Sequence, residues 1–192
     1  MSRIRFQGYR EGTIAITTMI ALSACADEAQ PLSKETIAER AARLTAPQPG
    51  LYRTTSELVN FELPNAPPPE AERMRHRFGF VEPQVAEACL TAEEAARGFL
   101  PLLDAMQDGT CQFIRFDTGE TSLDALMQCE SANGTISQAE MTGETSTSAS
   151  SLETRIEQRG EGLPGGEMRF TLLVETMRLG SCAGEGSGIA GN

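Results

Sequence analysis

Two cysteines, Cys111 and Cys129, bracket the stretch that most constrains how this chain folds. Side chains of an extended strand alternate between its two faces. The residues before Cys129 keep that alternation, with Leu126 as the one apolar exception: Leu123, Ala125, Met127 and Cys129 share one face, and Asp124, Gln128 and Glu130 share the other. Directly opposed residues of an antiparallel pair come within reach of a disulfide after modest twisting. The pattern predicts a β-hairpin closed by its own cysteines, or two free thiols on a core face if the compartment is reducing.

The cysteine pairing also predicts the register of this hairpin. With the two cysteines opposed, Phe113 faces Met127 and Arg115 faces Ala125. Residues 118–122 then form a five-residue loop that includes a glycine, a common length for hairpin loops.

Residues 1–24 have the organisation of a secretory signal peptide. Arg3, Arg5 and Arg10 make a basic start, and the mostly apolar residues 12–21 suit a signal-peptide core but are too short to cross a bilayer as a helix. The next four residues, Leu22-Ser23-Ala24-Cys25, resemble the bacterial lipobox. That resemblance implies that Cys25 is diacylated on its sulfur and becomes the new N-terminus. The alternative is an ordinary signal peptide that is cut nearby.

The residues that follow Cys25 indicate whether a lipid anchor would be in the inner or the outer membrane. In lipoproteins of this type an aspartate directly after the cysteine usually signals retention in the inner membrane, and here Ala26 precedes Asp27. We therefore expect an anchor in the outer membrane, with the protein facing the periplasm; a soluble periplasmic protein is the alternative. Acyl chains contribute about 0.8 kcal/mol per buried methylene, so a multiply acylated cysteine anchors firmly. We expect no other segment to span a membrane.

The charge and composition of the mature chain exclude several classes of function. Removing residues 1–24 leaves 13 basic and 26 acidic residues, a net charge of −13, which argues against nucleic-acid binding and against adsorption to anionic lipid. No spacing typical of a calcium loop occurs. His76 is the only histidine, so one chain cannot build a histidine-based triad or a histidine-rich metal site. We expect no catalytic residue, no metal ligand and no cofactor.

Apart from Cys25, the chain has four cysteines: Cys89, Cys111, Cys129 and Cys182. In an oxidising periplasm an even number indicates disulfides, with three possible connectivities. The local pair Cys111–Cys129 leaves Cys89 to pair with Cys182. Loop-closure entropy gives upper values of about 3 kcal/mol for the first bridge and about 4.5 kcal/mol for the second. A zinc site is the rival, but no C-x-x-C or H-x-x-H spacing supports it.

Helices and strands can be placed along the rest of the chain. Strands are predicted over 51–63 and 84–90, over 152–159 with Leu152, Thr154 and Ile156 on one face, and around Phe170, Leu172 and Val174 on an inward face. Thr91 to Glu94 match a capping box that opens a helix over 91–107, which Gly98 and Pro101 break into two pieces. A weak helix capped by Ser33 is predicted before Pro47, either loose beside the domain or acting as a spacer. Residues 70–83 carry a basic run, Arg73 to Arg77, which is either a solvated helix or loop or a site for an anionic head group or partner.

Short strands at regular spacing, with turn signals between them, define the fold class. We predict a mainly β fold: an antiparallel meander of about seven strands that forms a curved sheet or a small barrel, with a short helix packed on it and two disulfides as staples. The predicted divisions are a signal peptide at 1–24, a lipidated tether with the weak helix at 25–48, the β domain at 49–183 and a flexible tail at 184–192.

An ordered set of motifs resembles one family of proteins. The set comprises Pro49-Gly50-Leu51-Tyr52, Cys89-Leu90-Thr91-Ala92-Glu93-Glu94, the Cys111 and Cys129 pair, and Leu179-Gly180-Ser181-Cys182. It is similar to the domain of unknown function family 3617, small exported proteins of Gram-negative bacteria, over roughly residues 48–183. Serine stands where the last motif of the family is expected to have aspartate. The resemblance implies an exported β domain and lends no catalytic residue.

Three functions are compatible with the sequence. The first is a non-catalytic lipoprotein of the cell envelope, with a binding or structural role. The second is a carrier of a small apolar ligand, because antiparallel barrels often hold such molecules. The third, an enzyme, lacks support because no serine, threonine or acidic residue is placed beside a base by the sequence.

Overall fold

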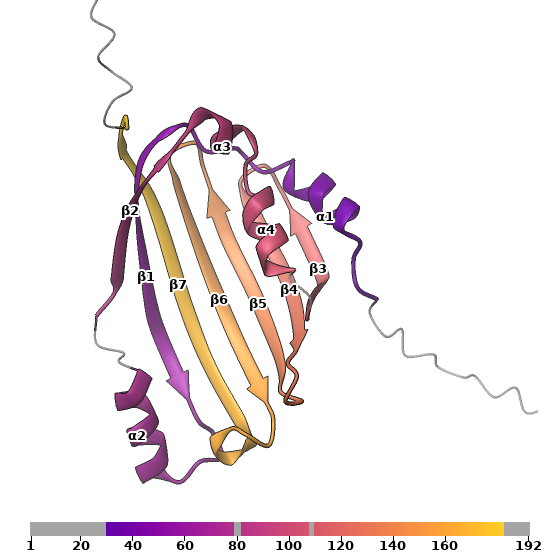
Figure 1. Cartoon of the computed structure of the whole chain (residues 1–192), viewed down its shortest axis with the longest axis vertical. Helices are drawn as coiled ribbons and strands as arrows, with labels where there is room; N and C mark the ends of the chain where they lie inside the picture. The colour runs from indigo at the N-terminus through magenta and orange to yellow at the C-terminus, as the bar shows by residue number, and fades with distance from the viewer. Residues whose placement is uncertain (1–29, 79–81, 108–109, 183–192) are drawn as a thin grey trace, which may run out of the picture.

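A computed structural model describes residues 30–78, 82–107 and 110–182 of the chain as a seven-stranded antiparallel sheet with short helices (Figure 1). The strands are β1 (Gly50–Glu62), β2 (Gln84–Leu90), β3 (Cys111–Thr118), β4 (Ser122–Glu130), β5 (Ile136–Thr145), β6 (Ala149–Arg159) and β7 (Glu167–Gly180). The helices are α1 (Lys34–Ala41), α2 (Pro68–Phe78), α3 (Ala92–Ala96), α4 (Leu100–Met106) and the 3₁₀ turn η1 (Pro164–Gly166). The predicted mainly β fold class is confirmed. Of the two predicted forms, a curved sheet or a small barrel, the structure has the sheet.

The order of strands in the sheet is β2-β1-β7-β6-β5-β4-β3. Strands β3 to β7 form a meander, and β1 and β2 extend it beyond β7, so that β2 and β3 are the two edges of an open sheet. The chain leaves β2 at one edge and enters β3 at the other, so it must cross the whole sheet between them. Helices α3 and α4 lie on that crossing, and α4 lies over one face of the sheet (Figure 1).

The two faces of the sheet differ in chemistry. The inner face, on which α1 and α4 pack, carries a row of residues that are paired from strand to strand: Ala125, Met141, Thr154 and Leu172. The outer face carries cross-strand and same-strand ion pairs, which include Arg53–Glu87 at 2.8 Å, Arg115–Asp124 at 2.7 Å and Arg155–Glu153 at 2.6 Å. Exposed pairs of this kind contribute little to stability individually, so they mainly keep this face in water. The alternation predicted for residues 152–159 and 170–174 is confirmed.

The central hairpin has the predicted register at its open end and a correction near its middle. Cys111 opposes Cys129 and Phe113 opposes Met127, as predicted. The predicted pair Arg115–Ala125 is wrong, because a β-bulge between Phe113 and Arg115 shifts the register. Arg115 instead lies opposite Leu126, on the outer face.

The bulge has a clear physical reason. It lets the Arg115 guanidinium reach Asp124 in solvent and turns Phe116 inward opposite Ala125, where uninterrupted alternation would have buried the charge. Phe113 and Phe116 then meet edge to face, with ring centroids 5.1 Å apart, and both are fully buried.

Helix α1 belongs to the core. Ser33 caps it as predicted, with its hydroxyl accepting from the Thr36 amide at 3.2 Å. Ile37, 1% exposed, and Ala41 pack in one cluster with Leu103, Phe113, Phe116, Ala125 and Met141. The expectation of a loose helix or spacer does not hold, because Ile37 and Ala41, one turn apart, are buried in the same cluster as the Phe113 and Phe116 rings.

The segment around α1 also covers one edge of the sheet. The Leu32 amide donates to the Phe113 carbonyl at 2.8 Å, and the Thr118 hydroxyl donates to the Arg40 carbonyl at 2.7 Å. The Arg40 guanidinium reaches the Phe116 carbonyl and the Asp117 carboxylate, each at 2.9 Å. In the described part of the chain no strand pairs with the far side of β2, where Val85 is 59% exposed. The two edges are therefore managed differently, with β3 covered and β2 left short and open.

One glycine of the family-like motif is required by a close approach of two chains. Gly50 has φ +152°, and a β-carbon there would lie 2.3 Å from the Gly180 carbonyl oxygen and 2.5 Å from Arg178 Nε. Any larger residue would push β1 away from the end of β7, so this position favours glycine.

The basic run lies on α2. The Arg73 Nε donates to the Pro69 carbonyl at 3.2 Å, and His76 Nε2 lies 3.3 Å from Glu72 Oε1 on the next turn. Arg73, His76 and Arg77 are exposed. Of the described helices, none is long and apolar enough to span a bilayer. The predicted signal peptide, the predicted lipidation site Cys25 and the predicted tail over 184–192 lie outside the described residues.

Candidate functional site

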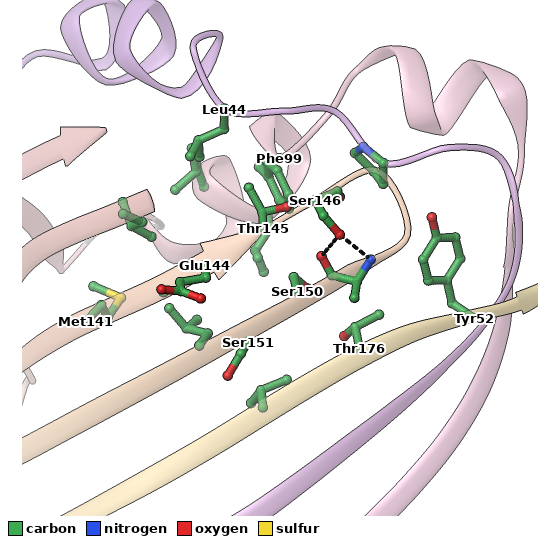
Figure 2. A pocket seen from close by; sticks show the side chains of 18 of the residues that line it. Leu44, Tyr52, Phe99, Met141, Glu144, Thr145, Ser146, Ser150, Ser151 and Thr176 are labelled. Atoms are coloured by element: carbon green, nitrogen blue, oxygen red, sulfur yellow. Dashed lines mark hydrogen bonds between the residues drawn. The ribbon is translucent and has the colours of Figure 1, made fainter. Parts of the chain in front are cut away.

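A cavity of about 480 Å³ lies between the inner face of the sheet and the crossing that carries α3 and α4 (Figure 2). Strands β1 to β7 all contribute to its lining, together with Leu44 and Pro47 after α1. The sequence does not foretell this space, because its walls come from segments that only the edge-to-edge crossing brings together.

The space exists because small residues occupy the inner face beneath the crossing. Ala88 in β2, Gly143 in β5 and Ser150 in β6 line its floor, whereas Phe113, Phe116 and Met141 form its wall toward the β3 edge. A β-carbon on Gly143 would already meet Leu152 Cδ1 at 3.1 Å. Larger side chains at these positions would close the space.

One wall of the cavity is apolar. Phe99, Leu103 and Met106 recur at helical spacing along α4 and its N-cap, and the stripe faces the sheet, as predicted for core packing. The same stripe is also the roof of the cavity. Leu103 is 6% exposed and belongs to the core cluster, whereas the adjacent Leu102 also lines the cavity and remains 55% exposed.

The opposite end of the cavity is rich in hydroxyl groups (Figure 2). Tyr52, Ser150 and Thr176 stand on inner-face positions of three neighbouring or near-neighbouring strands. The Tyr52 hydroxyl donates to the Gln48 carbonyl at 2.7 Å. The Ser146 hydroxyl accepts from the Ala149 amide at 3.0 Å and closes the β5–β6 turn.

The charges around the cavity are exclusively negative among the described residues that line it. The lining contains two acidic residues, Glu94 and Glu144, and no lysine, arginine or histidine. Glu144 occupies an outer-face position of β5, opposite Ser151. Glu94 completes the predicted capping box, with its carboxylate accepting from the Thr91 amide at 2.9 Å. The Thr91 backbone amide and then the Thr91 hydroxyl lower the pKa of Glu94, so this carboxylate stays ionised.

The four predicted bridge cysteines come together in the two expected pairs. Cys111 joins Cys129 across the hairpin, with a Cα–Cα distance of 4.0 Å. Cys89 joins Cys182 over a Cα–Cα distance of 5.6 Å and ties the edge strand β2 to the chain just after β7. Cys89 also lines the cavity, so this bridge holds one of its walls.

Sequence reasoning missed the hydroxyl residues of the cavity. Ser150 lies in a Ser/Thr-rich stretch whose composition is equally typical of a polar loop, and Thr176 follows the predicted inward run of β7. Alternation along the strand could have identified Thr176, because it lies on the same face as Leu172 and Val174. In the part of the chain that the structure describes, no group of three or more His, Cys, Asp and Glu side chains is placed to hold a metal ion.

Comparison with known families gives one match. The model of a family described as a protein of unknown function (DUF3617) matches residues 47–182, which include all seven strands. Comparisons with curated proteins and with solved structures give no match.

Proposed function

The chain belongs to this family of unknown function, and from the cavity we propose that it is a non-catalytic binding protein of the cell envelope that holds a small apolar ligand. The single observation that carries the proposal is a cavity of about 480 Å³ roofed by α4 and floored by small residues of the sheet.

The cavity has the properties of a ligand site rather than of a packing fault. Small-molecule sites usually enclose about 300–1,000 Å³, with mostly apolar walls and a few convergent polar groups. Packing defects in protein interiors are much smaller, because interiors are close-packed. An apolar molecule in this space would bury surface of Phe99 and Leu102 and gain about 25 cal/mol for each Å² of apolar area removed from water.

A binding role is favoured over catalysis by what the lining groups already contact. A hydroxyl nucleophile needs an adjacent base. The Tyr52 hydroxyl donates to a backbone carbonyl, the Ser146 hydroxyl is engaged by its own turn, and the Glu94 carboxylate accepts from Thr91. None of these contacts joins a nucleophile to a base.

The proposal includes attachment to the outer membrane through Cys25, with the domain facing the periplasm. The lipobox-like residues before Cys25 and the two disulfide pairs both support an envelope location. A Cys25→Ser variant is expected to leave the membrane fraction. Full recovery of this variant in membranes after detergent-free washing would contradict the anchor and would leave the binding proposal untouched.

Binding is tested with N-phenyl-1-naphthylamine, an uncharged probe that fluoresces in apolar surroundings. The full mature protein is expected to bind it with saturation. A Val174→Phe variant, which adds a ring on the inner face inside the cavity, is expected to lose most of the signal. The matched control is Leu173→Phe, in which the same ring is added one residue away on the outer face.

The variants Val174→Phe and Leu173→Phe together distinguish binding of the probe in the cavity from non-specific binding to the protein surface. Equal probe binding by both variants, with circular dichroism showing that both are folded, would overturn the proposal. Mass spectrometry of lipid extracted from protein purified out of membranes supplies the natural ligand. Extracts that hold no apolar molecule in repeated preparations, combined with no probe binding, would also contradict it.

A further inference from the structure

We infer that the ligand of this cavity is an amphiphile whose polar end is uncharged, such as an alcohol or an ester, and that carboxylates and phosphates are excluded. This inference rests on the proposed function, because it specifies the chemistry of the molecule that the cavity holds. Three observations carry it: a row of hydroxyls across the sheet, an apolar row beside it, and the absence of a cation from the described lining.

The hydroxyl row runs across four adjacent strands. Thr145 of β5 pairs with Ser150 of β6, Ser150 pairs with Thr176 of β7, and Thr176 pairs with Thr54 of β1. The Thr54 and Thr176 hydroxyl oxygens lie 3.2 Å apart, within hydrogen-bond distance. Among the described residues, the Ser150 hydroxyl in the middle of the row has no protein partner and lines the cavity. A hydroxyl both donates and accepts, so the row suits the hydroxyl or carbonyl of a neutral head group.

The next row of residues on the inner face is apolar. Gly143, Leu152 and Val174 follow in register on β5, β6 and β7, and all three line the cavity. Beyond them lies the aromatic wall made by Phe113 and Phe116. The cavity therefore has a polar end and an apolar length, which is the complement of a single chain with one polar terminus.

Charge decides which polar terminus fits. A buried carboxylate without a partner is strongly disfavoured, so sites for fatty acids or phosphates supply a cation. Here the described lining has none. The basic residue that comes next along β7, Arg178, lies two positions beyond Thr176, does not line the cavity, and donates its Nε to the Pro49 carbonyl at 2.9 Å.

The negative charges nearby act in the same direction. Glu94 is ionised at the cavity wall, and the whole chain carries a net charge of −11. An anionic head group would therefore be repelled as well as left without a partner. An ammonium group would be attracted by these charges, but Glu94 Oε2 already accepts from the Thr91 amide and hydroxyl, and Glu144 occupies an outer-face position, so neither carboxylate pairs with a head group at the hydroxyl row.

The experiment compares three ten-carbon competitors that differ only in the head group: decan-1-ol, decanoate and decylamine. Each is titrated against N-phenyl-1-naphthylamine bound to the full mature protein near pH 8, with decanoate and decylamine below their micelle concentrations and decan-1-ol below its solubility limit. We expect decan-1-ol to compete at least about tenfold better than decanoate, which corresponds to the loss of one charge-assisted contact. Decanoate or decylamine competing as well as the alcohol would overturn the inference.

A pair of lysine variants tests the position of the head group. Ser150→Lys places a cation in the middle of the hydroxyl row and is expected to strengthen decanoate competition about tenfold while weakening that of decan-1-ol. The control is Thr142→Lys on the outer face, where the new cation lies opposite Asp124 and Glu153 and should change neither value.

The outcomes separate the two proposals. If the probe binds and the alcohol and the acid compete equally, or if Thr142→Lys changes decanoate competition as much as Ser150→Lys does, only the head-group inference fails. If the probe does not bind to the folded protein at all, the proposed function fails and the inference fails with it.

Discussion

The two ends of the inner face are built on one sheet with one alternation, yet one is filled and the other is hollow. At the β3 edge, Phe113, Phe116 and Met141 pack in the core cluster beneath α1 and α4 and form the wall where the cavity ends, and the segment before α1 covers the strand edge. Toward the β2 edge, Ala88, Ser150 and Thr176 leave a cavity, and the strand edge is open. The comparison teaches that side-chain volume at equivalent positions, rather than the pattern of faces, separates a filled core from a cavity.

The two disulfides follow the same division. Cys111–Cys129 closes a hairpin whose strands already pair along their length, whereas Cys89–Cys182 holds the edge strand that walls the cavity. The filled end has packing to hold it as well as its bridge. The hollow end relies more on the bridge, because β2 pairs only with β1 in the described sheet.

The largest expected effect is the loss of the Cys89–Cys182 bridge. The double variant Cys89→Ser/Cys182→Ser is expected to lose up to about 4.5 kcal/mol of unfolding free energy, since it opens a loop with a sequence separation of 93. The double variant Cys111→Ser/Cys129→Ser, with a separation of 18, is expected to lose up to about 3 kcal/mol. Urea unfolding followed by circular dichroism measures both. A larger loss for the hairpin pair would break the comparison.

Two adjacent leucines of α4 allow the filled core and the cavity roof to be compared within one helix. Leu103→Ala is expected to cost about 3 kcal/mol, because it opens a void in the core cluster. Leu102→Ala is expected to cost about 0.5 kcal/mol or less, since its side chain is largely exposed, but to weaken N-phenyl-1-naphthylamine binding. Thermal unfolding and probe titration of both variants give the comparison. If Leu102→Ala proved as destabilising as Leu103→Ala, the helix would be packed evenly and the cavity roof would not be as described.

Two alanines on inner-face positions test volume directly. Ala125 is 0% exposed in the filled end, and Ala125→Leu is expected to cost about 1–3 kcal/mol through overpacking. Ala88→Leu adds the same atoms at the cavity wall and is expected to change stability by about 0.5 kcal/mol or less while reducing probe binding. The two free energies come from urea unfolding. Equal costs at the two sites would mean that the hollow end holds no room for a side chain.

A modest effect, which depends on pH, is expected at the start of α3, which begins the cover over the hollow end. Thr91→Ala removes the cap and is expected to cost about 1 kcal/mol at neutral pH. Because the folded state lowers the pKa of Glu94, its contribution is fully present above the ordinary glutamate value and is lost as pH falls through the lowered one. The cost of Thr91→Ala should therefore shrink between about pH 7 and about pH 3. A cost that does not change with pH would mean that Glu94 does not assist the cap.

Much of the fold was readable because its causes are local. The capping box at Thr91 and Glu94, the cap at Ser33 and the strand from Gln84 to Leu90 follow from hydrogen-bonding side chains and turn residues next to them in sequence. The register error at Arg115 shows the limit of that reading. The bulge places Arg115 in solvent and Phe116 in the core. A prediction that assumes strict alternation of faces cannot include a bulge, so it misses this shift.

The burial of the helix at Lys34–Ala41 also could not be predicted from the residues near it in the sequence. Its few apolar residues make it a weak helix alone, and its burial depends on Phe113 and Phe116, which lie far along the chain. The proposed site has the same origin. Thr54, Thr145, Ser150 and Thr176 read as ordinary strand residues until the register of four strands sets them in one row.

By itself, the sequence determined most of the strands and their faces, the helix caps and the local pair Cys111–Cys129, because alternation and capping act between near neighbours. Only the tertiary structure decided that the sheet stays open, that the chain crosses it from edge to edge, and that this crossing leaves a cavity over small residues. Those features depend on which distant side chains meet and how much volume they fill together, and no single stretch of the chain contains that information.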